Sequence, residues 1–283
     1  MVLPLLPCLG LADRLPPWLR AAAMAAVAVT MLGLAGCKST GDITGSISGP
    51  AAALPATPEG LQGFSDEWGK RYEASPGDKL AAINYARALR AQARTAQAVA
   101  VLQGAVIKYP DDLDVLGAYG KALADAGRFK EAADILARSH TPERPNWSIL
   151  SAQGSVADQM GEHQAAQGYY EAALKIMPGD PAVLSNLGLS YARSSQLPRG
   201  ETTLRQAAAH PQADRRVRQN LALVLALQGK FAEAEEVSRR DLSPAEAASN
   251  VAAIRAMIAQ SNTWREIQKP GAGKAGRQAA AGQ

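Results

Sequence analysis

Cysteine is nearly absent from this sequence. Among its 283 residues only Cys8 and Cys37 occur, so no thiol nucleophile or thiolate metal ligand follows position 37. A disulfide between the two is the simplest use of such a pair in an oxidising compartment. His140, His163 and His210 lie far apart, and no HExxH motif occurs. The sequence therefore indicates a protein that is not an enzyme, with no metal site, no cofactor and no small-molecule substrate.

Aromatic residues and net charge are also scarce. Aromatics make up 5% of the chain and hydrophobic residues 47%, with alanine prominent, which favours close helix packing over a β-sandwich. Residues 1–36 hold two arginines and one aspartate, a net +1, and residues 268–283 hold three cations and no acid, a net +3. Because the whole chain carries +4, residues 37–267 are neutral. A neutral body lacks the basic surface that nucleic-acid binding requires, so a nucleic-acid partner is excluded.

An uncharged run precedes the second cysteine. Arg14 and Arg20 are followed by about 15 residues rich in alanine, valine, methionine and leucine, which end in small residues. This is shorter than the roughly 20 residues that span a bilayer as a helix. Basic residues, an apolar run and a small-residue cleavage point are the features of a secretory leader. We expect residues 1–36 to be a signal peptide.

The end of that run, Leu34-Ala35-Gly36-Cys37, resembles the bacterial lipobox. The resemblance implies that Cys37 is lipidated and becomes the new N-terminus, which supplies the covalent lipid and the membrane anchor. An ordinary leader with a chance cysteine is the alternative. Lys38 follows the cysteine, and the sorting rule of enteric bacteria then implies an outer-membrane, lipid-anchored protein on the periplasmic face. Residues 37–60 are rich in Gly, Ser, Thr, Pro and Ala without a period, which predicts a flexible tether.

The body of the chain repeats every 34 residues. Small residues recur in two columns and a larger residue recurs four positions after the second column. The first column is Ala86, Gly120, Gly154, Gly188 and Ala222, the second is Ala98, Ala132, Ala166, Gly200 and Ala234, and the third is Leu102, Leu136, Tyr170, Leu204 and Ser238. Small residues allow two helix axes to approach closely, and larger ones fill the space between units.

This pattern resembles the tetratricopeptide repeat, most closely in Ser185–Ala192 and Gly161–Pro181. The resemblance implies an all-α fold, a tetratricopeptide-repeat superhelix of about five helix-turn-helix repeats plus capping helices. The repeats occupy residues 79–242. Their predicted starts are Lys79, Leu113, Trp147, Pro181 and Arg215.

Glycine marks three of the predicted turns within repeats. Gly127, Gly161 and Gly229 are suited to end the first helix of their repeats. Ala93 and Ser195 occupy the same place in the first and fourth repeats, where the turn is less clearly indicated.

Both ends of the array are predicted to be capped. Residues 61–78 match only the second helix of a preceding unit, which predicts an N-terminal capping helix. Residues 243–267 begin with a capping box of Ser243 and Glu246, which predicts a C-terminal capping helix. Its predicted apolar face is Ala248, Val251, Ile254 and Ile258. Residues 268–283 have no period and are predicted to be a disordered tail.

The repeat resemblance implies that the first helices line a groove for a partner. The family's inward positions and a neighbouring asparagine column give the partner-binding residues. These are Asn84, Arg87, Arg90, Lys121, Asp125, Ser155, Asp158, Asn186, Arg193, Gln219 and Asn220, with Ser151 and Arg216 beside them. The asparagines have a purely structural alternative, bonding of neighbouring backbone. The paired lysines and asparagines that hold C-terminal carboxylates in chaperone-binding relatives are not reproduced, which disfavours that ligand.

The C-terminal part resembles one family more specifically. Arg218–Ile258, and Asp241–Ile258 above all, look like the last repeat and closing helix of TadD, the lipoproteins of Flp (tight adherence) pilus assembly. The resemblance implies protein-protein binding to the pilus secretin or other Tad secretion components, in the manner of a pilotin. The alternative is a general periplasmic adaptor in envelope biogenesis, serving outer-membrane protein assembly or peptidoglycan enzymes.

Overall fold

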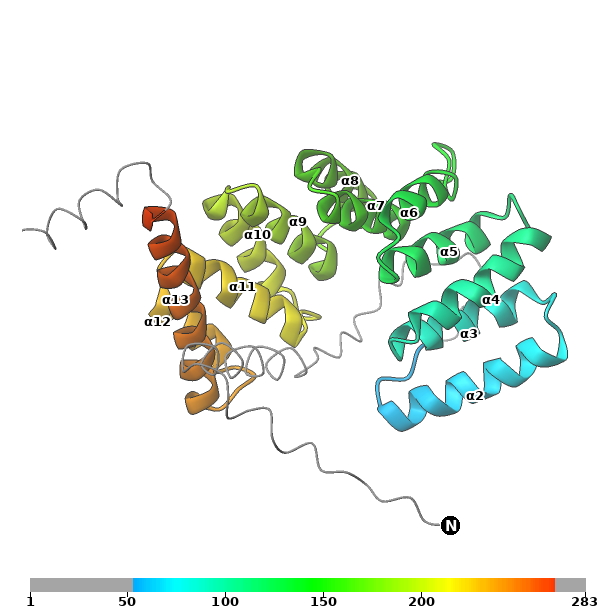
Figure 1. Ribbon diagram of the computed structural model, residues 1–283, viewed down its shortest axis with the longest axis horizontal. Coiled ribbons are helices and arrows are strands. Elements are labelled where there is room, and N and C mark those ends of the chain that lie inside the picture. The colour runs from blue at the N-terminus through cyan, green and yellow to red at the C-terminus, as the bar shows by residue number, and fades with distance from the viewer. Residues whose placement is uncertain (1–52, 268–283) are drawn as a thin grey trace, which may run out of the picture. The chain divides into compact units, whose positions relative to one another are not determined.

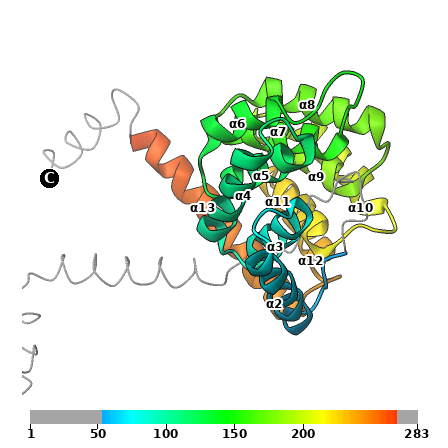
Figure 2. The same cartoon turned by 90° about the vertical axis from the view of Figure 1, so that its right-hand side faces the viewer.

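The computed structural model describes residues 53–267, and of residues 261–267 the backbone alone. Within these residues the chain forms helices and no strand (Figures 1 and 2). The helices are α2 (Pro58–Ala74), α3 (Lys79–Ala91), α4 (Thr95–Lys108), α5 (Leu113–Asp125), α6 (Phe129–Ala137), α7 (Trp147–Gln159), α8 (His163–Ile176), α9 (Pro181–Arg193), α10 (Leu197–Ala209), α11 (Arg215–Leu227), α12 (Phe231–Ser238) and α13 (Pro244–Ile267). The predicted signal peptide, the lipidated Cys37 and the predicted tail lie outside the described residues. None of the described helices has the length and apolar character needed to cross a membrane.

The five predicted repeats are present as five helix pairs, α3–α4 to α11–α12. Each pair begins at the predicted residue, because the residue before it caps the first helix. The caps are Asp78, Asp112, Asn146, Asp180 and Asp214, spaced by 34 residues. Each side chain accepts hydrogen bonds from backbone N–H groups of the first helical turn, which would otherwise lack a partner.

The turns inside the repeats share one backbone conformation. Gly127, Gly161 and Gly229 have φ values of 75°, 82° and 79°, and Ala93 and Ser195 have 59° and 63°. In each turn the next residue donates its N–H to a carbonyl five residues back, as Arg94 does to Leu89 at 2.8 Å and Gln196 to Tyr191 at 2.8 Å. The two turns without glycine thus adopt the same left-handed geometry, at a steric cost that glycine avoids.

The small residues lie where the two helices of a repeat cross. Ala86, Ala98 and Ala166 are completely buried. A Cβ atom on Gly188 would lie 2.6 Å from the side chain of Leu204, and one on Gly200 would lie 2.7 Å from the Gly188 carbonyl oxygen. Packing at the crossings therefore depends on small residues, as the columns predict.

The helices form two rows. First helices contact the first helices of the next repeat, α3 to α5, α5 to α7, α7 to α9 and α9 to α11. Among the described residues, second helices of neighbouring repeats have no Cα atoms within 8 Å of each other. The row of first helices is therefore the more tightly packed, and it carries the polar residues that the sequence nominates.

The N-terminal capping helix packs on α3 as a second helix would, but its bounds differ from the prediction. The tether is predicted to continue to Gly60, and α2 instead begins at Pro58. Thr57 Oγ1 accepts the N–H of Gly60 at 3.1 Å and Pro58 fits the first helical turn, so the helix starts three residues earlier. The helix ends at Ala74, before Pro76.

The C-terminal helix α13 packs on α11 and α12. Its capping box is present, since the N–H and Oγ of Ser243 lie 2.9 and 2.6 Å from a Glu246 carboxylate oxygen. One predicted face residue was wrong: Ala247 is buried, whereas Ala248 is exposed. Ala247 lies four residues before Val251, and that spacing directs it to the same packed face.

Candidate partner-binding surface

One stripe of residues runs across the five first helices. On each helix it consists of four residues spaced by four, three and four, a spacing that places them on one helical face. We call it the first-helix stripe. It comprises Leu80, Asn84, Arg87 and Ala91 on α3; Asp114, Ala118, Lys121 and Asp125 on α5; Ser148, Ala152, Ser155 and Gln159 on α7; Ala182, Asn186, Leu189 and Arg193 on α9; and Arg216, Asn220, Leu223 and Leu227 on α11.

In the first two repeats the polar stripe residues bond to each other. Arg87 is buried and donates to Asn84 Oδ1 at 3.0 Å, while Asn84 Nδ2 has no hydrogen-bond partner in the described part of the chain. Lys121 is also buried, and its Nζ lies 2.6 Å from Ser148 Oγ on α7. Lys121 thus links α5 to α7, whereas Arg87 and Asn84 bond within α3, and these buried side chains expose little area to a partner.

Arg90 and Asp125 form an ion pair beside the stripe. Arg90 Nε on α3 donates to Asp125 Oδ2 at the end of α5, at 2.6 Å. Both residues were predicted to bind a partner separately, and the fold brings them together across two repeats. The pair lies near the surface, where such pairs contribute little stability.

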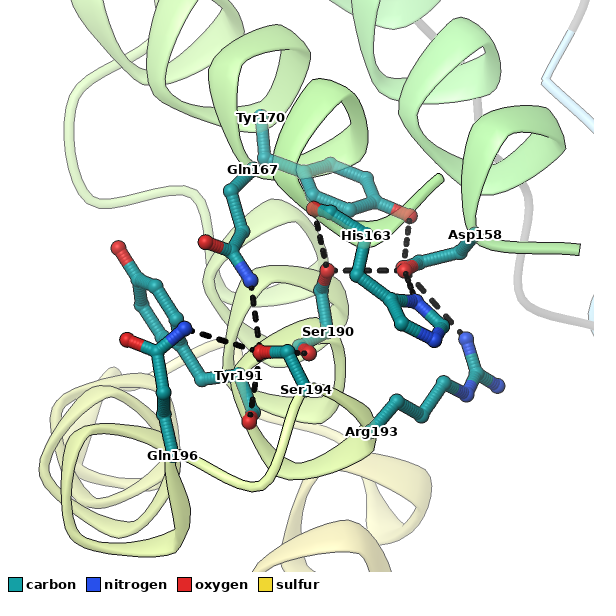
Figure 3. A network of polar contacts seen from close by, with 9 residues as sticks. All are labelled: Asp158, His163, Gln167, Tyr170, Ser190, Tyr191, Arg193, Ser194 and Gln196. Carbon is teal, nitrogen blue, oxygen red and sulfur yellow. Dashed lines mark hydrogen bonds and ion pairs between the residues drawn. The ribbon is translucent and has the colours of Figure 1, made fainter. Parts of the chain in front are cut away.

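Asp158 is the centre of a buried polar network at the junction of α7, α8 and α9 (Figure 3). Its carboxylate lies 2.8 Å from His163 Nδ1, 2.8 Å from Ser190 Oγ and 3.3 Å from the Tyr170 hydroxyl. Arg193 Nη1 approaches it at 3.5 Å. A buried carboxylate needs such donors to replace the water it has lost.

Burial and the negative charge of Asp158 raise the pKa of Tyr170 far above its ordinary value, so the hydroxyl stays protonated and can donate to that carboxylate. The polar groups of this network are bonded to one another, so their role is to hold the three helices in place. The network fixes the helix α9 from which Arg193 projects.

A second node joins α8, α9 and α10 around Ser194, also drawn in Figure 3. Gln167 and Gln196 each donate an amide N–H to Ser194 Oγ at 3.0 Å. The Ser194 hydroxyl reaches the carbonyl oxygens of Ser190 and Tyr191 at 3.1 and 3.0 Å. Together with Asp158, this node joins the third and fourth repeats by side-chain hydrogen bonds.

In the fourth and fifth repeats the stripe has a different character. Leu189 and Leu223 occupy the position that holds Arg87 and Lys121 in the first two, and both are half-buried. Leu227 at the end of α11 is 42% exposed. At this position the stripe thus changes from internally bonded polar residues to half-buried leucines along the array, although Leu80 at its start on α3 is 41% exposed as well.

The asparagines and the glutamine of this region are placed differently. Asn220 donates to Ser185 Oγ on α9 at 2.9 Å, so it joins two first helices. Asn186 is half-buried, and Gln219 is exposed one residue from the stripe. Asn220 therefore makes a structural contact, but with a side chain of the preceding repeat and not with the neighbouring backbone.

The predicted binding residues are distributed over several environments. Asn84, Arg87, Lys121, Ser151 and Asp158 are buried; Arg90, Ser155, Asn186, Arg216 and Asn220 are half-buried; Asp125, Arg193 and Gln219 are exposed. Whether any of them contacts a partner stays a prediction. Sequence reasoning missed His163, Tyr170 and Ser190 as partners of Asp158, and it did not join Arg90 to Asp125.

The contacts between neighbouring first helices could have been found in the sequence from a spacing of 35 residues. It separates Arg90 from Asp125, Asp158 from Arg193 and Ser185 from Asn220. One repeat plus one residue connects corresponding faces of neighbouring first helices. Complementary residues at that spacing therefore indicate an inter-repeat contact.

Ionisable side chains outside these two networks pair with one another and hold helices together. Burial raises the pKa of Glu201, but hydrogen bonds from Lys230, Arg205 and Gln228 outweigh it and hold the pKa below its ordinary value. Within residues 53–267 no three His, Cys, Asp or Glu side chains gather in a way that could hold a metal ion.

Comparisons with known proteins agree with this architecture. Two family models, each described as a tetratricopeptide repeat, match residues 89–153 and residues 151–214 and 185–247. Together they cover residues 89–247, which is more than half of the chain. No curated protein matches the sequence.

Solved structures with the same fold come from several kinds of protein. PilW, a type IV pilus biogenesis factor, superposes with a TM-score of 0.59 and 15% identity over 68% of this chain and 91% of its own. A thermophilic tetratricopeptide-repeat protein of Thermus thermophilus gives 0.53 and 19% identity over 62% of this chain and 96% of its own. A chain of the APC/C hetero-tetramer Cut9-Hcn1 gives 0.56 and 17% identity over 68% of this chain, which spans only 40% of it. With its five helix pairs, this chain belongs to the tetratricopeptide-repeat family.

Proposed function

We propose that the protein is an outer-membrane lipoprotein that binds protein partners through its first helices during assembly of the Flp (tight adherence) pilus. The observation that carries the binding role is the stripe of the fourth and fifth repeats. There Leu189 and Leu223 are half-buried, Leu227 is 42% exposed, and Arg216 makes no hydrogen bond or ion pair within the described residues. Tetratricopeptide repeats are protein-binding modules, so an accessible stripe of this kind fits that role.

The anchor in this proposal is Cys37. Its position after an apolar run and small residues supports lipidation. A lipid chain gains about 0.8 kcal/mol for each buried methylene, so several chains on one residue hold a protein firmly on a membrane. Residues 38–57 then separate the repeats from the bilayer, which leaves the first helices accessible to a periplasmic partner.

The pilus assignment rests on the C-terminal segment. Asp241–Ile258, which resembles the closing helix of TadD proteins, forms the link after α12 and most of α13. The fold of PilW is the same, although at 15% identity that likeness concerns the fold alone. In this proposal the protein acts on the secretin as a pilotin, promoting its transfer to the outer membrane or its multimerisation.

Acyl labelling tests the anchor. Cells that express the wild type, Cys37→Ser or Cys8→Ser are labelled with a radioactive fatty acid, with and without globomycin, and their membranes are fractionated. We expect label and outer-membrane location for the wild type and Cys8→Ser, and neither for Cys37→Ser. Label or membrane retention in Cys37→Ser at the wild-type level would remove the anchor from the proposal.

Secretin assembly tests the pilus role. In a deletion strain we expect the heat-resistant secretin multimer to decrease in the outer membrane, and the wild-type gene to restore it. Normal multimers in that strain, together with co-purification of β-barrel precursors or peptidoglycan enzymes, would instead identify a general envelope adaptor.

A further inference from the structure

We propose that the stripe on α9 and α11 binds an acidic partner segment that presents leucine-like side chains between its carboxylates. This rests on the proposed function as a protein-binding module and specifies the chemistry of the partner. The segment would place apolar side chains on Leu189, Leu223 and Leu227 and carboxylates against the neighbouring arginines.

Most of the apolar side chains of this surface lie in the last two repeats, although Leu80 on α3 is also 41% exposed. The corresponding stripe position holds Arg87, Lys121 and Ser155 in the first three repeats, and Leu189 and Leu223 in the last two. Leu227 adds a third apolar side chain with 42% of its surface exposed. Leu189 also packs partly against the core around Leu204 and Leu221. The surface that these leucines leave exposed, which is greatest at Leu227, favours an apolar contact from outside.

The charged residues within α9 and α11 are four arginines, and the aspartates next to them, Asp180 and Asp214, cap the first turns of the two helices. Arg218 is committed to Asp241, and Arg193 approaches Asp158 at 3.5 Å with 45% of its side chain exposed. Arg215 is exposed and lies near the carboxylates of Asp241 and Glu246, whose pKa values it helps to lower. Arg216 has no bonded partner among the described residues and lies on the same helical face as Leu223, so a carboxylate is its complement.

The terminal segments of this chain have the wrong charge for the site. Residues 268–283 contain two lysines, one arginine and no acid, and residues 1–36 have a net charge of +1. The first has no acidic side chain and the second has a single aspartate, so neither is an acidic segment that would complement Arg216. Charge complementarity thus favours a separate protein over an intramolecular occupant.

The first two repeats are a poor alternative location. Arg87 and Lys121 are buried and bonded, and Arg90 is paired with Asp125. A partner carboxylate there would have to displace existing bonds, whereas Arg216 is available without such a loss. The same partner chemistry therefore selects the C-terminal part of the stripe.

The test uses the full-length lipoprotein in detergent and three fluorescent 14-residue peptides. The first alternates pairs of leucine and aspartate, the second replaces aspartate with lysine, and the third replaces leucine with serine. Fluorescence anisotropy measures the Kd of each at low and moderate salt. We expect the acidic leucine peptide to bind at least about tenfold more tightly than either of the others, and its affinity to fall as salt rises.

Two variants and two matched controls locate the site. Arg216→Glu and Leu227→Ser should each weaken binding of the acidic leucine peptide, the first by about tenfold. Lys130→Glu on α6 and Ile107→Ser on α4 change an exposed cation and a 79% exposed apolar side chain in second helices, and should leave Kd within about twofold. Circular dichroism confirms that each variant is folded.

Three results would overturn the inference: no binding of the acidic leucine peptide, equal binding of the lysine peptide, or an unchanged Kd in folded Arg216→Glu. The secretin experiment reports separately on the proposed function. A normal secretin in the deletion strain would leave the peptide result standing, and a failed peptide assay would leave the anchor and pilus roles standing.

Discussion

Arg218 on α11 donates two hydrogen bonds to Asp241, from Nε to Oδ2 at 2.7 Å and from Nη2 to Oδ1 at 2.6 Å. Together these two hydrogen bonds join α11, which is the first helix of the fifth repeat, to the link between α12 and α13. Both side chains are largely buried, so the pair is better shielded from water than most ion pairs of the array. It therefore helps to hold α13 on the end of the stack.

Replacing Asp241 with asparagine should weaken this attachment by about 1–2 kcal/mol at pH 7. The hydrogen bond from Arg218 holds the pKa of Asp241 below its ordinary value of 3.8. A depressed pKa stabilises the fold above the unfolded value, and that stabilisation is lost as pH falls through the folded value. The difference in thermal unfolding between wild type and Asp241→Asn should thus be largest above about pH 4 and shrink below it.

Glu236→Gln is the control, because Glu236 is exposed on α12 and makes no ion pair within the described residues. It should change the unfolding temperature little at any pH. A difference between Asp241→Asn and wild type that stays constant from pH 7 to pH 2.5 (roughly one unit below the ordinary carboxyl value) would contradict the role given to this carboxylate.

The left-handed turns predict two stabilising substitutions. Ala93→Gly and Ser195→Gly should each raise the free energy of unfolding by up to about 1 kcal/mol, because glycine adopts φ near +60° without the clash of a Cβ atom. Gly161→Ala should do the reverse by a similar amount, since space is available around it and only its φ of 82° opposes the change. Urea denaturation measures all three, and a destabilised Ala93→Gly would contradict the argument.

Glycines in the helix crossings should respond according to their surroundings. In Gly200→Ala the new Cβ meets the Gly188 backbone oxygen at 2.7 Å, and a backbone atom cannot turn away. We expect a loss of about 1–3 kcal/mol. Gly168 on α8 has no atom within 4 Å of such a Cβ, so Gly168→Ala should stabilise by roughly 0.5–1 kcal/mol through helix propensity. Equal effects at the two sites in thermal unfolding would show that packing does not decide them.

Removing the central carboxylate of the buried network should be costly. Asp158→Ala leaves Ser190 and His163 without their acceptor, and we expect a loss of about 2–4 kcal/mol. Hydrogen exchange should increase chiefly in α8 and α9. Asp134→Asn on the exposed face of α6 is the control and should fall within about 0.5 kcal/mol of wild type. Uniformly faster exchange along the whole array would argue against a local role for Asp158.

The sequence predicted the regular parts of this fold because they depend on local chemistry repeated at a constant interval. Small residues at crossings, glycine at three turns and the Ser243 capping box each determine a feature within one repeat. The Asp and Asn caps at Asp78 and Asn146 follow the same interval and could have been found by it. Ala93 and Ser195 were harder, because neighbouring helices impose a conformation that neither residue prefers.

The candidate surface was less predictable because burial depends on the distance between first helices. Lys121 is polar by type, yet α5 and α7 approach closely enough to enclose it against Ser148. Leu189 and Leu223 are apolar by type, yet they are accessible at the corresponding position. Residue type alone therefore nominated Lys121 and omitted the leucines.

The separation of the second helices has a mechanical consequence. Neighbouring repeats are joined along the row of first helices, while the described second helices have no Cα atoms within 8 Å of each other across repeats, although the Arg205–Glu233 ion pair links α10 to α12. Bending that changes the spacing between second helices breaks few contacts. The array should therefore be elastic in that direction and stiff along the row of first helices. Such a protein can adjust its curvature to the diameter of what it holds, and it can do so without unfolding any of its repeats.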